Sequence, residues 1–270
     1  MVEISPLATV SPKAVLGDGV VVGPYAYIEG DVQIGEGTRV FPHAVIFDHV
    51  RMGTGCQVFP GAVVGAIPQD LKFKGELSYV EIGDRVTVRE CATVNRGTAA
   101  SGKALTRVGS DTLLMSYSHV AHDCRVGSHC ILTSYAGIAG ETDMDDWAIL
   151  GGGTMAHQFS KIGCHAMVGG GCTVVKDVPP YSLCGRDPLC YSGVNIVGLR
   201  RRGFSLEVIR NIKEIYNTIF YSRYNISDGC ARVEEAFPES EEKRAILDFI
   251  RDSKRGIVRA VEIVQKPLDE

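Results

Sequence analysis

The chain has 270 residues, of which 45% are hydrophobic and 22% are charged, and its formal net charge is −4. This balance is typical of a folded globular protein, and it excludes both a disordered chain and the strongly basic surface that favours nucleic acid. The nine cysteines show no paired CxxC spacing, so we expect reduced, buried thiols and no metal site.

The first residues, MVEISPLATVSPKAVLG, lack the basic and apolar segments of a secretory signal. No stretch of the sequence has the apolar length of a membrane span. We therefore expect a cytoplasmic protein, a compartment in which cysteines stay reduced.

A six-residue repeat begins at Ile4. Aliphatic side chains stand at every sixth position from Ile4 to Val64, and small residues such as Ala8 and Ala14 follow four positions later. An α-helix has a period of 3.6 residues and a flat strand a period of 2, so neither explains this spacing. The repeat is typical of a parallel β-helix, in which three short strands form one triangular coil and coils stack about 4.8 Å apart. We expect the aliphatic side chains to fill the interior of the coils.

Two segments interrupt the repeat and are predicted to leave the coil as loops. The first spans residues 66–79 and contains the polar run QDLKFKGE, and the second spans residues 97–107, GTAASGKALTR. A longer series of repeats then runs from Val108 to Val174. Because scaffolds rarely interrupt their own repeat, the loops argue against a purely structural solenoid.

The pattern changes after residue 195. Ser205 is an expected N-cap, and apolar residues from Ile209 to Ile219 recur at helical spacing. Further helical segments are expected at residues 233–237 and 245–250. We therefore divide the chain into a β-helix domain, residues 1–195, and a C-terminal α-helical domain, residues 196–270, which covers the last coil.

A coil of eighteen residues places each residue below the one eighteen positions later. His122, Gly140 and Gln158 are related in this way and should form one column, with His157 beside it. Imidazole is the side chain best suited to accept and return a proton near neutral pH, and a glycine N–H can approach an oxyanion closely. The column predicts acyl transfer, with His122 as general base and Gly140 as oxyanion donor.

Asp123 is a candidate partner of His122, but neighbours on an extended strand point to opposite faces. The pairing requires a corner of the coil at this position, and without one Asp123 is a carboxylate on a solvated surface. Most single histidines have no catalytic role. Four others are assigned to that class: His43, His49, His129 and His165.

Four ordered motifs carry a resemblance to a known family: DLKFKGE at 70–76, SHVAHDC at 118–124, MAHQF at 155–159 and GVNIVGLRRRGFS at 193–205. The chain resembles the bacterial UDP-N-acetylglucosamine O-acyltransferases. These enzymes transfer an (R)-3-hydroxyacyl chain from acyl carrier protein to the 3-hydroxyl of UDP-N-acetylglucosamine, the first step of lipid A synthesis. The resemblance implies a left-handed parallel β-helix, a homotrimer with active sites between subunits, and no cofactor.

The resemblance also implies roles for single residues. His122 matches the family's general base, Asp123 its partner and Gly140 the oxyanion donor. A guanidinium fork suits a diphosphate, which fits two arginines among the expected substrate-binding residues. These residues are Asp70, Lys72, His119, His157, Gln158, Asn195, Arg201 and Arg202. Candidates for setting the acyl length are Gly169, Gly170 and Gly171.

Two positions depart from the family pattern. Glu141 stands where familiar members have a histidine after the oxyanion glycine, and Val197 stands where they often have an acidic residue. The substrate contacts made at these two positions are therefore open.

Two other enzymes are alternatives. The N-acyltransferase of the same pathway resembles a longer chain with an extra N-terminal domain, for which a repeat starting at Ile4 leaves no room. A zinc hydrolyase resembling the γ carbonic anhydrases shares the coil, and His119, His122 and His157 would supply three imidazoles. Against zinc, the basic turn and the helical tail would then have no purpose.

Overall fold

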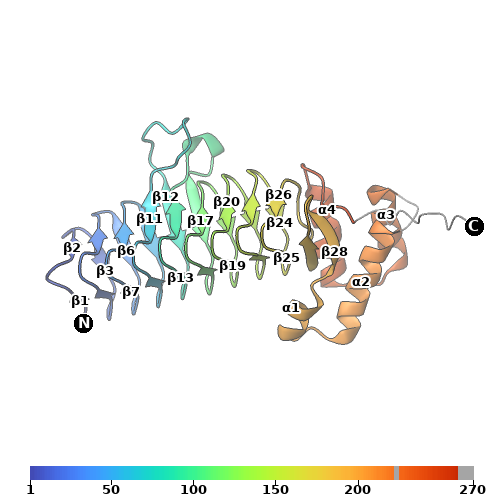
Figure 1. Cartoon of the computed structure of the whole chain (residues 1–270), viewed down its shortest axis with the longest axis horizontal. Helices are drawn as coiled ribbons and strands as arrows, with labels where there is room; N and C mark the ends of the chain where they lie inside the picture. Colours follow the sequence, from blue (N-terminus) through green and yellow to red (C-terminus); the bar gives the residue numbers. More distant parts are fainter. Residues whose placement is uncertain (222–224, 261–270) are drawn as a thin grey trace, which may run out of the picture.

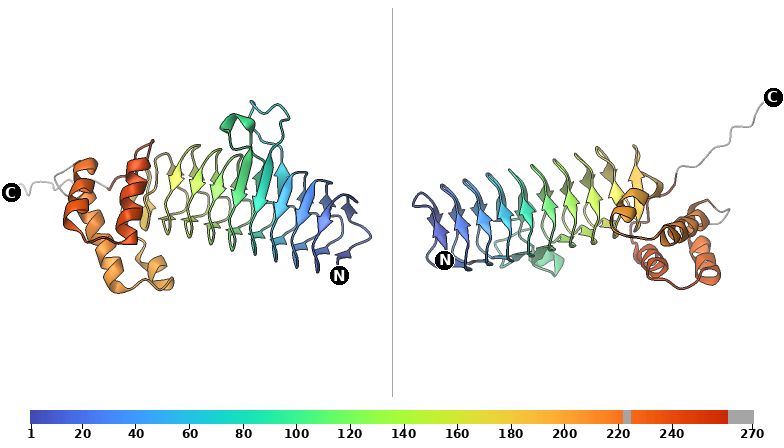
Figure 2. Two further views of the ribbon diagram at one scale, coloured as in Figure 1. Left: turned by 180° about the vertical axis from the view of Figure 1, so that it is seen from behind. Right: turned by 90° about the horizontal axis from the view of Figure 1, so that it is seen from below.

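The computed structural model describes residues 1–221 and 225–260 of the chain. It is an elongated prism of stacked coils with a cluster of helices at its C-terminal end (Figure 1). Two loops project together from the middle of the prism, as Figure 1 and the left view of Figure 2 show. The predicted end of the helical domain, residues 261–270, lies outside the described residues, as do residues 222–224.

Each face of the prism is one sheet, built from the short strands of successive coils. Within the described residues, sheet A consists of β1 (Glu3–Ile4), β4 (Val21–Val22), β7 (Arg39–Val40), β10 (Gln57–Val58), β13 (Thr87–Val88), β16 (Leu113–Leu114), β19 (Ile131–Leu132), β22 (Ile149–Leu150), β25 (Met167–Val168), β27 (Ser182–Gly185) and β28 (Cys190–Val194). Sheet B consists of β2 (Thr9–Val10), β5 (Tyr27–Ile28), β8 (Val45–Ile46), β11 (Val63–Ala66), β14 (Thr93–Asn95), β17 (His119–Val120), β20 (Gly137–Ile138), β23 (Met155–Ala156) and β26 (Thr173–Val174). Sheet C consists of β3 (Val15–Leu16), β6 (Val32–Ile34), β9 (Val50–Met52), β12 (Tyr79–Ile82), β15 (Leu105–Val108), β18 (Arg125–Val126), β21 (Asp143–Met144) and β24 (Lys161–Ile162). All neighbouring strands pair in parallel except β27 and β28, which form an antiparallel hairpin after the last coil.

The aliphatic series fills the interior as predicted. Ile46, Leu114 and Leu150 are 0% exposed, and burying each such side chain contributes about 1.5–3 kcal/mol. Ile4 is 47% exposed, because it stands in the first coil and no earlier coil covers it. All nine cysteines are free thiols; six are buried as expected, whereas Cys91, Cys164 and Cys190 are half-buried.

The corner between sheets B and C, called the B–C corner below, turns through left-handed residues that are not glycine. Asp123, Glu141 and Phe159 have φ angles of 60°, 58° and 65°, a conformation that costs about 1–2 kcal/mol per residue. Stacking holds it in place, since the N–H of Glu141 donates to the carbonyl of His122 and that of Phe159 to the carbonyl of Gly140. Each residue at this corner is therefore fixed by the coil below it.

Both loops leave the coil at the B–C corner. The first, residues 67–78, connects β11 to β12 as predicted, and the second, residues 96–104, connects β14 to β15 and contains the 3₁₀ turn η1 (Ala99–Ser101). The predicted second loop, 97–107, ends too late: Leu105, Thr106 and Arg107 pair with β12 and belong to β15. The change in the phase of the six-residue repeat is therefore complete before residue 105.

The C-terminal part is helical, as predicted. Its helices are α1 (Ile196–Arg201), α2 (Leu206–Phe220), α3 (Ile226–Ala236) and α4 (Glu241–Asp252). Ser205 caps α2 by accepting from the N–H of Val208, and the buried Tyr216 of α2 donates its hydroxyl to the carbonyl of Pro180 at 2.5 Å. This contact joins α2 to the end of the last coil. In the described part of the chain, no helix has the length and apolar content needed to cross a bilayer.

Candidate active site

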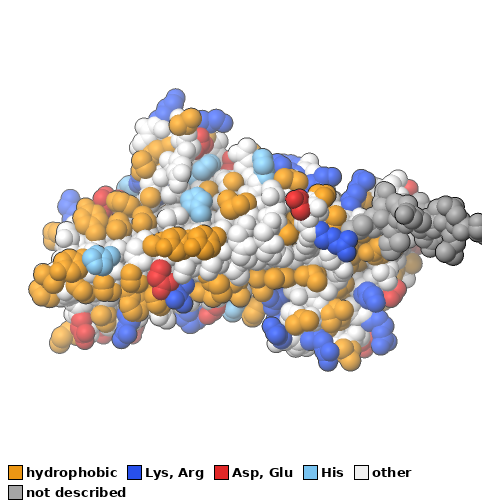
Figure 3. Space-filling model, in the orientation of Figure 1, with side chains coloured by type: hydrophobic (Ala, Val, Ile, Leu, Met, Phe, Trp, Pro, Cys, Tyr) orange, Lys and Arg blue, Asp and Glu red, His pale blue; other side chains and the backbone are white. Residues whose placement is uncertain are grey.

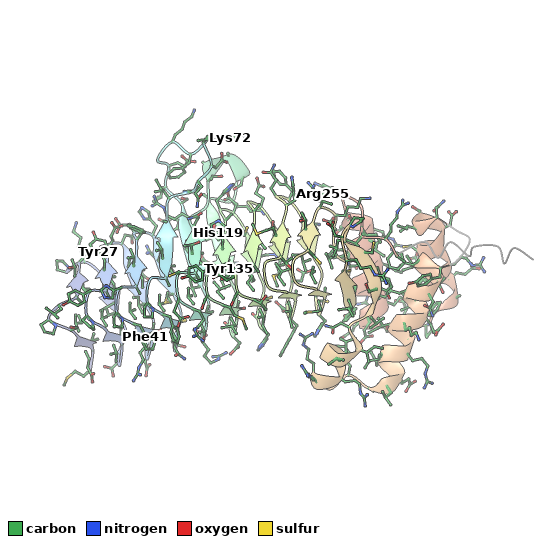
Figure 4. The ribbon with its side chains drawn as sticks, in the orientation of Figure 1. Tyr27, Phe41, Lys72, His119, Tyr135 and Arg255 are labelled. Atoms are coloured by element: carbon green, nitrogen blue, oxygen red, sulfur yellow. The ribbon has the colours of Figure 1, made fainter. Side chains whose placement is uncertain are left out.

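A groove of about 590 Å³ lies along the B–C corner at the foot of the first loop. Figure 4 shows Lys72 on this loop, above His119 on the coil, and histidines gather at the foot of the loop in Figure 3. The groove is lined by Gln69, Asp70, Leu71, Lys72, Asn95, His119, Ala121, His122, Ile138, Ala139, Gly140, Met155 and Gln158. Loop and coil, far apart in sequence, thus contribute to one site.

His122 and Asp123 form a hydrogen-bonded pair inside this corner. Their Nδ1 and Oδ2 atoms are 2.8 Å apart. The corner that the pairing requires is present, because the left-handed conformation of Asp123 interrupts the alternation of an extended strand. The Asp123 side chain is 0% exposed, so the reading of a carboxylate on a solvated surface is wrong.

The second loop surrounds the Asp123 carboxylate with donors. Thr98 donates its N–H to Oδ1 at 2.9 Å and its hydroxyl to Oδ2 at 2.7 Å, and the Ser101 hydroxyl donates to Oδ1 at 2.7 Å. Burial raises the pKa of Asp123, but the hydrogen bonds from Ser101, His122 and Thr98 outweigh burial and hold that pKa below its ordinary value. Asp123 is therefore a carboxylate near neutral pH and an acceptor for a proton on Nδ1 of His122, which leaves Nε2 as the acceptor on the groove side.

Gly140 lies directly against the His122 ring. A Cβ at this position would be 2.4 Å from Nε2 of His122, so only glycine permits the approach. The predicted column of His122, Gly140 and Gln158 is therefore present. Within the described residues, the Gly140 N–H donates to no backbone carbonyl and is available to a substrate oxygen.

Two further groups face the catalytic pair across the groove. Asp70 of the first loop places Oδ2 3.9 Å from Nε2 of His122. His119 of β17 bonds through Nδ1 to the hydroxyl of Thr93 at 2.7 Å. Burial, and secondly the charge of His122, lower the pKa of His119, so this imidazole is neutral near neutral pH.

The remaining predicted residues lie outside this groove. His157 is exposed and its Nδ1 is 3.1 Å from the carbonyl oxygen of Gln158. Asn195 caps α1 by accepting from the N–H of Gly198, and Arg201 is exposed at the end of the same helix. None of the three lines the groove that contains His122.

Arg202 belongs to a different corner, between sheets C and A. Its guanidinium lies 5.2 Å from the Trp147 ring and 3.2 Å from Nδ1 of His165. Trp147 and His165 stack with His129 and Tyr181 in an aromatic ladder. This corner therefore holds a second cluster of side chains that could bind a ligand, a guanidinium group and a stack of aromatic rings.

The other predicted positions are spread over the surface. The connection from β25 to β26 contains Gly169, Gly170 and Gly171. Strand β26 pairs with β23, which carries Met155. Glu141 follows Gly140 at the B–C corner, and Val197 is 61% exposed on α1. The three candidate acyl-length glycines therefore lie at the corner between sheets A and B, one coil beyond Met155.

Sequence reasoning missed three residues of the site. Thr98 and Ser101 hold Asp123 from the second loop, and Asn95, only 3% exposed, lines the groove with an Oδ1 atom that has no hydrogen-bond partner. A signal for Asn95 was present, because a polar side chain directly follows the inward Val94 at the start of the second interruption.

One chain alone does not bring together the three histidines of the zinc alternative, whose ligands would lie across a subunit interface. His157 does not line the groove that contains His119 and His122. Across residues 1–221 and 225–260, no group of three His, Cys, Asp or Glu side chains is arranged to hold a metal ion.

Comparison with known proteins gives consistent matches. A family model described as Udp N-acetylglucosamine O-acyltransferase, Domain 2, matches residues 177–258, and one of bacterial transferase hexapeptide repeats matches residues 13–48 and 105–140. The acyl-(acyl-carrier-protein)–UDP-N-acetylglucosamine O-acyltransferase of Alkalilimnicola ehrlichii is 49% identical over 96% of this chain and 100% of its own. The protein of the same name from Thiobacillus denitrificans is 43% identical over 96% of this chain and 100% of its own.

Solved structures agree with these matches. LpxA, a UDP-N-acetylglucosamine acyltransferase from Bacteroides fragilis, superposes with a TM-score of 0.92 at 49% identity and covers 94% of this chain and 99% of its own. LpxA from Acinetobacter baumannii gives a TM-score of 0.91 at 38% identity, with 95% and 99% covered. The expected left-handed parallel β-helix with a C-terminal helical domain is thereby confirmed.

Proposed function

Because the chain belongs to the family of acyl-(acyl-carrier-protein)–UDP-N-acetylglucosamine O-acyltransferases, we propose that the groove at the B–C corner is its acyl-transfer site. The enzyme transfers an (R)-3-hydroxyacyl chain from acyl carrier protein to the 3-hydroxyl of UDP-N-acetylglucosamine, the first step of lipid A synthesis. The observation that carries the site assignment is the buried His122–Asp123 pair, with Nε2 of His122 in the groove.

His122 acts as the general base. Its Nε2 removes the proton from the sugar hydroxyl while that oxygen attacks the thioester carbonyl, and Asp123 stabilises the resulting imidazolium. The carbonyl oxygen, now negatively charged, accepts from the Gly140 N–H. When the tetrahedral intermediate collapses, the carbon–sulfur bond breaks and the departing thiolate takes the proton back from His122. General-base catalysis contributes about 10²–10⁴-fold and an oxyanion donor about 10²–10³-fold.

The other groove residues bind the two substrates. Asp70 and Lys72 are positioned by the first loop, where the N–H of Lys72 donates to the carboxylate of Asp70. His119 and Gln158 offer neutral polar groups from the coil. A compact set of hydrogen-bonding groups around one imidazole suits a sugar whose hydroxyl must be oriented.

We further propose a homotrimer in which His157, Asn195, Arg201 and Arg202 act across subunits. Support comes from the prism faces, because the outward residues in the C-terminal half of sheets A and B are uncharged whereas those of sheet C are charged. On sheet A these are Leu113, Ile131, Ile149 and Met167, and on sheet C they are Arg107, Arg125, Asp143 and Lys161. A contact of face A with face B of a second copy is heterologous, and such contacts give a closed ring when the rotation between copies is one third of a turn. This contact would lie beside the B–C groove.

The domain division between residues 195 and 196 and the cytoplasmic location are also proposals. Asn195 caps the first helix, which supports the boundary, although the family match to the second domain already begins at residue 177. An acyl donor attached to acyl carrier protein supports the location.

The experiment that tests the function uses purified protein, UDP-N-acetylglucosamine and acyl carrier protein loaded with 3-hydroxyacyl chains of several lengths. We expect equal amounts of sugar ester and free carrier thiol, measured by mass spectrometry and thiol titration. The same assay on variants tests the role of Gly169, Gly170 and Gly171. A larger residue at one of these positions should shorten the preferred acyl chain. Thiol release without sugar ester would show hydrolysis and contradict the proposal.

A further inference from the structure

The second loop packs closely against the buried Asp123 carboxylate. Asp123 is 0% exposed and Thr98 is 1% exposed. A Cβ at Gly97 would lie 2.7 Å from Oδ1 of Asp123, which shows how closely the loop backbone approaches the carboxylate. The backbone N–H of Asp123 itself donates to the hydroxyl of Thr106 at 2.8 Å.

The donors fill the capacity of the carboxylate. Oδ2 accepts from the Thr98 hydroxyl at 2.7 Å and from Nδ1 of His122 at 2.8 Å. Oδ1 accepts from the Thr98 N–H at 2.9 Å and from the Ser101 hydroxyl at 2.7 Å. An ionised carboxylate has about four lone-pair sites, so no site is left for a proton and no rotation of the group preserves the set.

The Ser101 hydroxyl has one proton and two acceptors within reach. Its oxygen is 2.7 Å from Oδ1 of Asp123 and 3.0 Å from the carbonyl oxygen of Thr98. The bond to the carboxylate is shorter and charge-assisted, so it is the favoured one. The N–H of Lys103 donates to the Ser101 oxygen at 3.0 Å and thereby orients the hydroxyl.

We propose that Thr98 and Ser101 are positioning residues of acyl transfer, whose hydroxyls hold Asp123 ionised and in one orientation so that Nε2 of His122 stays the proton acceptor. The inference rests on the proposed function of the groove. It assigns the second loop a part in the chemistry, although that loop is outside the repeat and neither Thr98 nor Ser101 lines the groove.

The two hydroxyls differ in a way that can be measured. Thr98 is buried and shares Oδ2 with His122, whereas Ser101 is half-buried and water can replace its hydroxyl. Thr98→Val should therefore have the larger effect, with kcat lowered about tenfold and the KM for UDP-N-acetylglucosamine unchanged. Ser101→Ala should lower kcat only a few-fold.

The proposal also predicts the direction in which the pH profile of kcat/KM should move. A carboxylate that has lost a hydroxyl donor attracts the Nδ1 proton more strongly and stabilises the imidazolium, so the acid limb of kcat/KM in Thr98→Val should move to higher pH by about half to one unit. Other charged groups near the pair stay in place in this variant. They are Asp70 and His119 on the groove side, and Lys103, Arg107, Arg125 and Asp143 around a cavity behind Asp123.

The experiment compares wild type, Thr98→Val, Thr98→Ser and Thr112→Val. Thr112 is a matched control, because its hydroxyl is equally buried but donates to the carbonyl of Gly127, away from the groove. Two pH profiles are measured for each: kcat/KM of acyl transfer, and the rate of carbethoxylation of His122, followed by peptide mass spectrometry. Thr98→Ser and Thr112→Val should match wild type, and both profiles should shift together in Thr98→Val.

Carbethoxylation needs no turnover, so it tests the positioning role separately from the reaction. Unshifted profiles in Thr98→Val would overturn the inference and leave the proposed function intact, whereas absence of ester formation by wild type would contradict only the function. A double variant provides the last check. Thr98→Val should add no loss to Asp123→Ala, because it acts through that carboxylate, and a further tenfold loss would mean that Thr98 acts only on the fold.

Discussion

Replacing Gly140 with alanine tests how strictly the coil sets the position of the base. The added Cβ would lie 2.4 Å from Nε2 and 2.5 Å from Cε1 of His122. Carbon and nitrogen atoms in contact are about 3.5 Å apart, so the ring must retreat by about 1 Å. A displacement of that size costs about 10²-fold in rate, so we expect kcat to fall about a hundredfold.

This loss should be specific to the position of the imidazole. Alanine keeps the backbone N–H, and Gly140 does not have a left-handed φ angle, so the backbone accepts the change. A matched control is Gly152→Ala, whose Cβ would meet the nearest atom, the carbonyl oxygen of Ser134, at an ordinary 3.4 Å. Steady-state transfer assays and thermal unfolding of both variants make the comparison. Turnover of Gly140→Ala within about threefold of wild type would refute the reasoning.

Three further predictions concern other parts of the molecule. His122→Ala should lower kcat by about 10²–10⁴-fold with an unchanged unfolding midpoint, and substantial remaining activity would contradict the base assignment. Arg201→Ala should raise the KM for UDP-N-acetylglucosamine with little change in kcat, and an unchanged KM would exclude this arginine from nucleotide binding. Burial, and secondly Arg202, lower the pKa of His165 to about 4. Folding therefore disfavours protonation of His165. The free energy of unfolding keeps its full value above about pH 6.5 and decreases as the pH falls towards 4, because the unfolded chain then binds a proton that the folded chain does not. His165→Phe should flatten the stability curve in that window, and denaturant unfolding at several pH values shows whether it does.

The six-residue period determined most of the coil in advance. Because strands of coils without a loop pair with the strand eighteen residues later, as His119 pairs with Gly137, periodicity alone predicted the column of His122, Gly140 and Gln158. It also predicted where the first loop departs, since an aliphatic position is missing there. A strict repeat fixes which side chains share a surface without any knowledge of distant contacts.

The parts outside the repeat were not predictable in the same way. Thr98 and Ser101 stand in a loop without register, so nothing in their spacing connects them with Asp123. The end of that loop was misplaced because Leu105 to Arg107 rejoin sheet C by pairing with β12, a long-range contact. The corner at Asp123 could not be predicted, because residue type does not indicate a left-handed conformation at this position. The equivalent positions of the next two coils hold glutamate and phenylalanine in the same conformation.

The two clusters of functional side chains lie on different corners of the prism, and this separation has a consequence for the enzyme. The proposed base His122, its carboxylate partner Asp123 and the proposed oxyanion donor Gly140 share the B–C corner, where backbone stacking and the second loop fix them within one chain. Arg202 lies at the C–A corner, against an aromatic ladder. In the proposed mechanism, the chemistry that needs sub-ångström placement is therefore internal to one chain. The proposed binding of a charged nucleotide tolerates longer contacts and would use a surface that a neighbouring copy can supply.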